Sequence, residues 1–178
     1  MRRSTVKFLL FVLILISAPA VYGQEVTREK TRERLGALLQ REGPGIKVSF
    51  RQSDKNPFNF VGILRDGLKH AESMEIVVMV SAKETIGFRV FPHYKGGYIN
   101  IDKVRNTTQL LRQLVQFNEK TFLYWGADDA GDVFTGYTFT LESGFPDEAL
   151  KIVLASIKNS DQFVGELRPA IDGSSGAP

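Results

Sequence analysis

The chain of 178 residues contains no cysteine, so no disulfide bond stabilises it and burial of a core must suffice. A lipid-modified exported protein needs a cysteine at its cleavage site, and that class is therefore excluded. Only two histidines are present, His70 and His93, and neither belongs to a His-x-x-x-His or Glu-x-x-His spacing. The composition predicts no metal site, no cofactor and no cysteine nucleophile.

Long hydrophobic runs are also missing. The longest run has nine residues, 8–16, and spanning a bilayer takes about 20. Basic residues precede the run and the sequence SAPAVYG follows it, an arrangement typical of a secretory signal peptide. We interpret residues 1–23 as a signal peptide cleaved before Gln24, with cleavage before Val21 or an uncleaved anchor as alternatives. The sequence thus predicts an exported protein, periplasmic or extracellular, without stable membrane insertion after cleavage.

The basic character of the chain comes from this leader. Three of the 23 Lys and Arg lie in residues 1–23, and all 20 Asp and Glu follow them, so the cleaved chain is formally neutral. Nucleic-acid binding is therefore not expected. The charge is uneven: residues 24–120 carry 17 basic and 11 acidic groups, and residues 121–178 carry 3 and 9. Either the two ends pack together in one domain, or the surface has two faces that pair head to tail or hold a charged partner.

Residues 24–163 are predicted to form one α+β domain, and residues 164–178 a flexible tail. Helical periodicity predicts helices over residues 27–40, from the N-cap Asn106, and from Pro146. Alternating apolar residues predict strands over 85–91 and 133–141. Apolar and aromatic runs predict strands over 60–64, where a helix is the alternative, over 76–80 and over 121–125. Residues 76–80 are apolar on both faces, which predicts a central position in the sheet. The order α-β-β-β-α-β-β-α predicts an antiparallel sheet of about five strands with helices packed on one side.

Residues 106–157 combine an amphipathic helix, an aromatic strand, an acidic turn, a second strand and the sequence LESGFPDEALKIVLASI. This pattern resembles the YbjN domain family, bacterial proteins that are described as similar to type III secretion chaperones. The resemblance covers residues 27–162 in element order and is clear in residues only in the last third. It implies an α+β fold, no known catalytic residues and often a dimer that binds another protein. Secretion chaperones, unlike this chain, are cytosolic and tend to be acidic.

The stretch YWGADDAGDVFTGYTFTL, residues 124–141, places Asp128, Asp129 and Asp132 close together. A calcium loop of the EF-hand type needs alternating carboxylates and a Glu six residues past the glycine, where this chain has Tyr137. A pair of catalytic carboxylates needs an apolar setting that a solvated turn does not supply. Asp and Gly favour tight turns, so we interpret the segment as a hairpin connection.

The same hairpin contains four aromatic residues that we predict as a binding surface for a protein partner: Tyr124, Trp125, Phe134 and Tyr137. Adjacent strand residues face opposite ways, so either Tyr124 or Trp125 points away from the core. That second face is either covered by other parts of the chain or exposed to a partner. The predicted function is an exported, non-catalytic, chaperone-like domain that binds a protein, including a second copy of itself. The alternative is a small-ligand binder or hydrolase with a pocket at Arg89, Tyr98 and Arg112.

Overall fold

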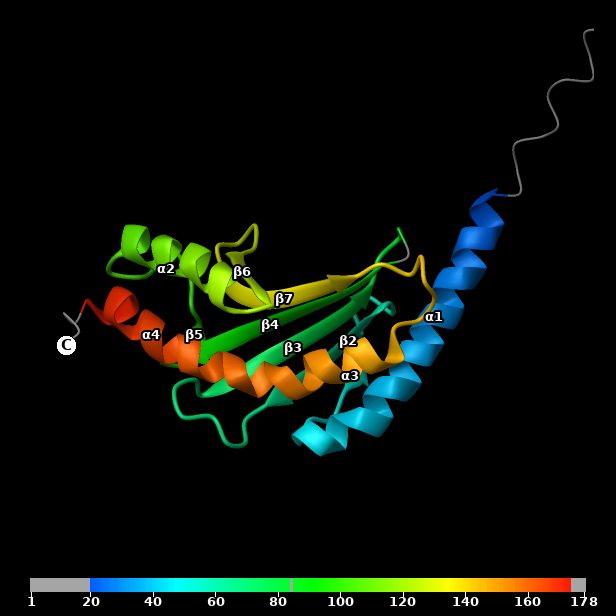
Figure 1. Ribbon diagram of the computed structural model, residues 1–178, viewed down its shortest axis with the longest axis horizontal. Helices are drawn as coiled ribbons and strands as arrows, with labels where there is room; N and C mark the ends of the chain where they lie inside the picture. The colour runs from blue at the N-terminus through cyan, green and yellow to red at the C-terminus, as the bar shows by residue number, and fades with distance from the viewer. Residues whose placement is uncertain (1–19, 84, 174–178) are drawn as a thin grey trace, which may run out of the picture.

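The computed structural model describes residues 20–83 and 85–173 as helices packed on one side of a sheet (Figure 1). The helices are α1 (Ala20–Glu42), α2 (Thr107–Lys120), α3 (Asp147–Ser156) and α4 (Asp161–Asp172), with 3-10 turns at Gly43–Ile46 and Ile157–Ser160. The strands are β1 (Arg51–Gln52), β2 (Asn59–Leu64), β3 (Ser73–Val80), β4 (Ile86–Tyr94), β5 (Gly97–Tyr98), β6 (Tyr124–Ala127) and β7 (Val133–Phe139). This arrangement confirms the predicted α+β class, with two very short strands added.

The strands lie in the order β1-β2-β3-β4-β7-β6, and every neighbouring pair is antiparallel. Strand β5 pairs with the far end of β4. The chain leaves β4, runs through α2 and returns to the sheet at β6, the edge strand. The turn of the last hairpin then brings β7 between β6 and β4, so the segments of residues 86–94 and 133–139 become neighbours.

Local signals explain where the helices begin. The side chain of Asn106 accepts a hydrogen bond from the backbone N–H of Gln109 at 2.9 Å, which confirms the predicted N-cap of α2. Asp147 and Glu148 lie in the first turn of α3, where acidic side chains stabilise the positive end of the helix dipole. Each helix also buries an apolar stripe, and this burial supplies most of its stability.

The core lies between the helices and one face of the sheet. On β3 the side chains of Met74, Ile76, Val78 and Val80 are at most 1% exposed. The helices contribute leucines that are equally buried, such as Leu35 of α1 and Leu110 of α2. At about 25 cal/mol per Å² of buried apolar surface, this layer is the main favourable term in folding.

The predicted flexible tail is wrong over its first part. Residues 164–172 belong to α4, in which Val164, Leu167 and Ala170 are fully buried. This apolar stripe has helical spacing, and the interspersed Gly165 and Pro169 hide it in the composition. The domain therefore extends to Asp172, and residues 174–178 lie outside the described part of the chain.

A second difference concerns β4, which continues through Pro92 to Tyr94, whereas the predicted strand ends at residue 91. Pairing of β4 with β7 ends at Val90, so Pro92 lies past the part of β4 that has β7 as a neighbour.

Most of the predicted signal peptide lies outside the described residues, and residues 20–23 form the start of α1. Over the ranges that are described, no helix has the length and hydropathy of a membrane span. Cleavage and export remain predictions.

Candidate protein-binding surface

The side of the sheet away from the helices is apolar, although no described helix covers it (Figure 1). On β3 the buried residues alternate with half-buried ones, and the half-buried side chains belong to this second side. We call the surface the open face and define it by ten residues of β2 to β7: Val61, Ile63, Glu75, Val77, Met79, Arg89, Phe91, Tyr98, Tyr124 and Phe134. A solvated side of an antiparallel sheet is normally polar, so this surface needs an explanation.

Aromatic rings form a continuous row across the open face. His93 and Tyr98 have ring centroids 4.4 Å apart, and Tyr98 lies 5.8 Å from Phe91. Phe91 is 5.7 Å from Phe134, which in turn lies 5.8 Å from Tyr124. Most of these contacts are edge-to-face, the arrangement that aromatic pairs prefer. The row joins β5, β4, β7 and β6 into one surface whose rings hold one another in place.

The polar groups on this surface interact with the rings. The hydroxyl of Tyr98 donates a hydrogen bond to the Glu75 carboxylate at 2.8 Å. Burial, and then this hydrogen bond, raise the pKa of Tyr98 to about 12. The Arg89 guanidinium lies 4.8 Å from the centroid of the Phe134 ring, a cation–π contact. The hydroxyl of Tyr98 thus stays protonated over the physiological range, and the open face combines aromatic rings, one cation and one carboxylate.

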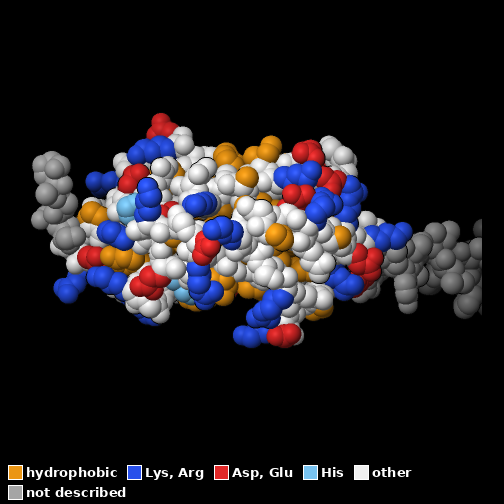
Figure 2. Space-filling model, turned by 90° about the horizontal axis from the view of Figure 1, so that it is seen from below, with side chains coloured by type: hydrophobic (Ala, Val, Ile, Leu, Met, Phe, Trp, Pro, Cys, Tyr) orange, Lys and Arg blue, Asp and Glu red, His pale blue; other side chains and the backbone are white. Residues whose placement is uncertain are grey.

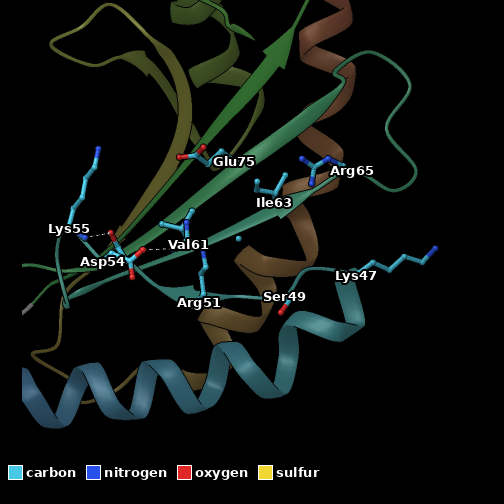
Figure 3. Close-up of a pocket in the computed structure, with 11 residues that line it drawn as sticks. Lys47, Ser49, Arg51, Asp54, Lys55, Val61, Ile63, Arg65 and Glu75 are labelled. Carbon is cyan, nitrogen blue, oxygen red and sulfur yellow. Dashed lines mark hydrogen bonds and ion pairs between the residues drawn. The ribbon is translucent and has the colours of Figure 1, made fainter. Parts of the chain in front are cut away.

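A basic groove continues the open face toward β1. Figure 3 shows Val61 and Ile63 of β2 and Glu75 of β3 beside Arg51 of β1. The groove has a volume of about 710 Å³. Lys and Arg side chains are spread widely over the side of the molecule seen in Figure 2, with fewer Asp and Glu among them.

Both edges of the sheet are poorly suited to adding another strand. The side chain of Asn118 accepts a hydrogen bond from the backbone N–H of Trp125 at 2.5 Å and donates one to its carbonyl at 3.3 Å. These bonds occupy the outer side of β6, and β1 at the other edge has only two residues. Short or covered edges prevent strand addition, so a partner is expected to approach the face instead.

The structure divides the four predicted binding residues between the two sides of the sheet. Tyr124 is 39% exposed on the open face, and Phe134 lies on the same side beneath it. Trp125 is only 4% exposed, in the core, with its ring centroid 5.4 Å from that of Phe117. Tyr137 also faces the helix side, where it packs on the core. The split follows the alternation of a strand, and protein binding by any of the four remains a prediction.

The acidic segment of residues 128–132 lies in the turn that connects β6 and β7. Asp128 closes the β6–β7 turn, because its carboxylate accepts the backbone N–H groups of Ala130 and Asp132 at 3.0 and 2.9 Å. Gly131 has a φ of 81°, as tight turns require. No cluster of three or more potential metal ligands occurs among the residues that the structure describes.

The three residues of the alternative pocket, Arg89, Tyr98 and Arg112, do not lie together in the structure. Arg89 and Tyr98 lie on the open face, whereas Arg112 is exposed on α2, on the helix side. The groove beside β1 is lined by none of these three residues.

Sequence reasoning missed the aliphatic part of the open face, formed by Val61, Ile63, Val77 and Met79. A signal was present, because residues 76–80 are apolar on both sides of the strand. A second exposed apolar surface also went unnoticed: Leu111 and Val115 of α2 are 43% and 69% exposed, and Phe122 after the helix is 54% exposed.

The fold and this surface define a single-domain α+β protein with an uncovered aromatic sheet face. The sequence matches no family model and no curated protein. Among solved structures, a chain in the "Crystal Structure of the ExsC-ExsE Complex" is similar, with 16% sequence identity and a TM-score of 0.46. The match covers 80% of this chain and 98% of that chain. A similarity of this size assigns neither a partner nor a function, and the resemblance to the YbjN family remains a prediction.

Proposed function

We propose that the protein is an exported, non-catalytic domain that binds another protein through the open face of its sheet. The observation that carries the proposal is the apolar and aromatic surface that no described helix covers. An uncovered patch of this kind costs solubility unless a partner buries it. The closed edges support the proposal, because they direct a partner to the face.

The chemistry of the face also fits protein recognition. Tyr and Arg are enriched at the energetic centres of protein interfaces, and both are present here as Tyr98, Tyr124 and Arg89. The rings are packed against one another, so binding would immobilise few additional rotamers. The surface is therefore organised before the partner arrives.

A site-specific photocrosslinker tests the proposal. Benzoylphenylalanine at Val77, in the middle of the open face, is expected to capture a polypeptide in the extracytoplasmic fraction of the source cells. The matched control carries the same group at Gln162, which is exposed on α4 on the helix side. Mass spectrometry of the adduct separates a second copy of the chain from a different protein. No adduct at Val77, or equal adducts at both positions, would overturn the proposal.

Export needs its own measurement. The intact mass of the tagged protein, recovered from cell fractions, is expected to correspond to loss of residues 1–23 in the extracytoplasmic fraction. A mass that fits loss of residues 1–20 would move the cleavage site to Val21 and leave export intact. Full-length protein in the cytosol alone would refute export.

A further inference from the structure

One wall of the groove in Figure 3 is formed by residues 47–55, whose side chains alternate between the core and the groove. Val48 and Phe50 are 2% and 8% exposed and pack in the core. The groove receives the residues between and beyond them, together with Asp54: Lys47, Ser49, Arg51, Ser53 and Lys55. Side chains on one face of a strand recur about every 6.6 Å. The wall therefore presents cations and hydroxyl groups in regular alternation.

The other wall belongs to β2 and β3. Val61 and Ile63 of β2 line the groove, and Ile63 is 40% exposed. Arg51 is paired with Val61 in the strand register, so the apolar side chains lie beside the cations of the first wall. Arg65 follows directly after β2, and Glu75 of β3 is paired with Ile63. The groove thus combines four cations, two carboxylates, two hydroxyl groups and an apolar strip.

Two of the four cations have weak partners. Lys47 lies 3.0 Å from Asp66, and Arg51 lies 3.4 Å from Asp54. The four side chains of these pairs are between 61% and 95% exposed. Exposed ion pairs contribute only about 0 to 1 kcal/mol, so the carboxylate of a partner can replace the present one at little cost.

The other two cations are unpaired. The side chains of Lys55 and Arg65 form no ion pair within the described ranges. Lysine on an edge strand prevents pairing with another strand, and this role suffices for Lys55. It does not explain Arg65, because Arg65 follows β2, an inner strand of the sheet. The groove therefore presents positive charge for which the described part of the chain has no use.

We infer that the groove binds an extended, acidic segment of the partner polypeptide, in which carboxylates are separated by apolar or small side chains. The inference rests on the proposed function and names the chemistry of the partner. A segment that lies over β1 and β2, along the strands, turns every second side chain toward the groove. Arg51 is four residues from both Lys47 and Lys55, and four extended residues span about 13 Å. Carboxylates at every fourth residue of the segment can therefore each meet a cation.

A polypeptide fits this groove better than a densely charged polymer such as polyphosphate. Asp54 and Glu75 repel a chain that is charged at every unit, and the strip of Val61 and Ile63 offers such a chain no polar contact. The groove also continues into the aromatic part of the open face. The register runs from Ile63 through Glu75 to Phe91, two strand spacings or about 10 Å away. About three further residues of the same polypeptide can reach this ring.

Synthetic peptides test the inference by fluorescence anisotropy with the purified protein. A labelled peptide of nine residues carries glutamate at its first, fifth and ninth places, with valine and serine between them. The control peptide has the same composition, but its three glutamates are consecutive. We expect the spaced peptide to bind at least about fivefold more tightly, because the consecutive glutamates cannot reach all the cations at once. Equal affinities, or no binding of either peptide up to about 1 mM, would refute the inference.

Charge reversal in the protein locates the site. Lys55→Glu and Arg65→Glu are each expected to weaken binding of the spaced peptide at least about fivefold. Both side chains are exposed and unpaired, so we expect the urea midpoint of each variant to stay unchanged. The matched control is Arg112→Glu, which reverses an exposed arginine of α2 on the helix side and should leave the affinity unchanged. A loss of the same size in Arg112→Glu would refute the groove as the site.

A charge swap separates recognition of the spacing from attraction to net charge. The double variant Lys55→Glu and Arg65→Glu is expected to lose the glutamate peptide and to bind a peptide with lysine at the same three places. Polyphosphate that binds the wild type as tightly as the spaced peptide, with the same loss in Arg65→Glu, would refute a polypeptide ligand. The photocrosslinker at Val77 distinguishes this inference from the proposed function. An adduct at Val77 that is unchanged by Arg65→Glu would refute the role of the groove and leave the proposed function standing.

Discussion

Asp161 links two segments that are far apart in the sequence, the β2–β3 connection and the start of α4. It is 6% exposed at the start of α4, and its carboxylate accepts the backbone N–H groups of Lys69, His70 and Ala71. The distances are 2.6 Å to Lys69, 3.1 Å to His70 and 2.8 Å to Ala71. The side chain thereby fixes the β2–β3 connection against the helix layer, and its position in the first turn of α4 also suits the helix dipole.

Asp161→Ala removes all three acceptors at once. A hydrogen bond to a charged group contributes about 1.5 to 3 kcal/mol, but three bonds to one carboxylate are not additive. Lys69 is exposed and the His70 backbone is only partly buried, so water can reach part of this segment in the variant. We therefore expect the free energy of unfolding to fall by about 3 kcal/mol, or about 6 to 12 °C in Tm for a domain of this size.

Urea unfolding followed by the fluorescence of Trp125, the single tryptophan, measures this loss. Asp161→Asn keeps one acceptor and is expected to lose about half as much. The control is Asp147→Asn, which breaks the exposed ion pair with Arg34 and removes one acidic side chain from the first turn of α3, and it is expected to cost about 1 kcal/mol. Hydrogen exchange at residues 69–71 should also accelerate in Asp161→Ala. A loss below about 1 kcal/mol with unchanged exchange would refute the reasoning.

Three further predictions follow from individual contacts. Asn118→Ala leaves the Trp125 N–H without its acceptor and is expected to lower the free energy of unfolding by about 1 to 2 kcal/mol. Amide hydrogen exchange in β6 should become faster, and unchanged exchange would contradict the prediction. Gly136→Ala places a methyl group against the Phe88 carbonyl and the Tyr124 ring, so we expect the free energy of unfolding, measured by thermal unfolding, to fall by about 1 to 3 kcal/mol. The control is Gly126→Ala, whose methyl group meets Phe134 at an ordinary 3.7 Å and should cost less than about 1 kcal/mol. Lys95 and Tyr94 donate hydrogen bonds to Asp172 and hold its pKa below the usual value of 3.8, so this stabilisation is present above about pH 4 and is lost as the pH falls through the lower folded pKa. Asp172→Asn should therefore lower the urea midpoint at pH 7 and approach the wild type near pH 2, and a difference that does not depend on pH would contradict this assignment.

The elements that sequence analysis predicted well are those with two independent signals. Helix α2 has both an apolar stripe and the N-cap Asn106, and both the stripe and the cap are present in the structure. Helix α4 has a stripe of the same quality, but Gly165 and Pro169 interrupt it and no capping side chain marks its start. Over residues 161–172 the helix propensities of single residues and the apolar periodicity therefore gave opposite predictions. Val164 and Leu167 are fully buried in the core, and this burial stabilises the helix.

The open face could be predicted only in part, because strand alternation reveals two apolar sides without saying which side the helices cover. Residues 76–80 are apolar on both sides, which predicted correctly that β3 is an inner strand of the sheet. Which side remains uncovered depends on where α1, α3 and α4 pack, and contacts between residues distant in sequence decide this.

Adjacent residues of β6 face opposite sides of the sheet, so their substitution can separate an effect on folding from an effect on binding. Trp125 and Tyr124 are adjacent in sequence, yet Trp125 packs between Phe117 and Phe163 in the core, and Tyr124 lies on the open face. Trp125→Ala would remove a large buried side chain and lower the free energy of unfolding by about 3 to 5 kcal/mol. A loss of partner binding in this variant could therefore not be distinguished from unfolding. Tyr124→Ala removes a ring that is 39% exposed and leaves the core intact. A binding defect in Tyr124→Ala with an unchanged unfolding midpoint is therefore the result that would assign the surface to recognition.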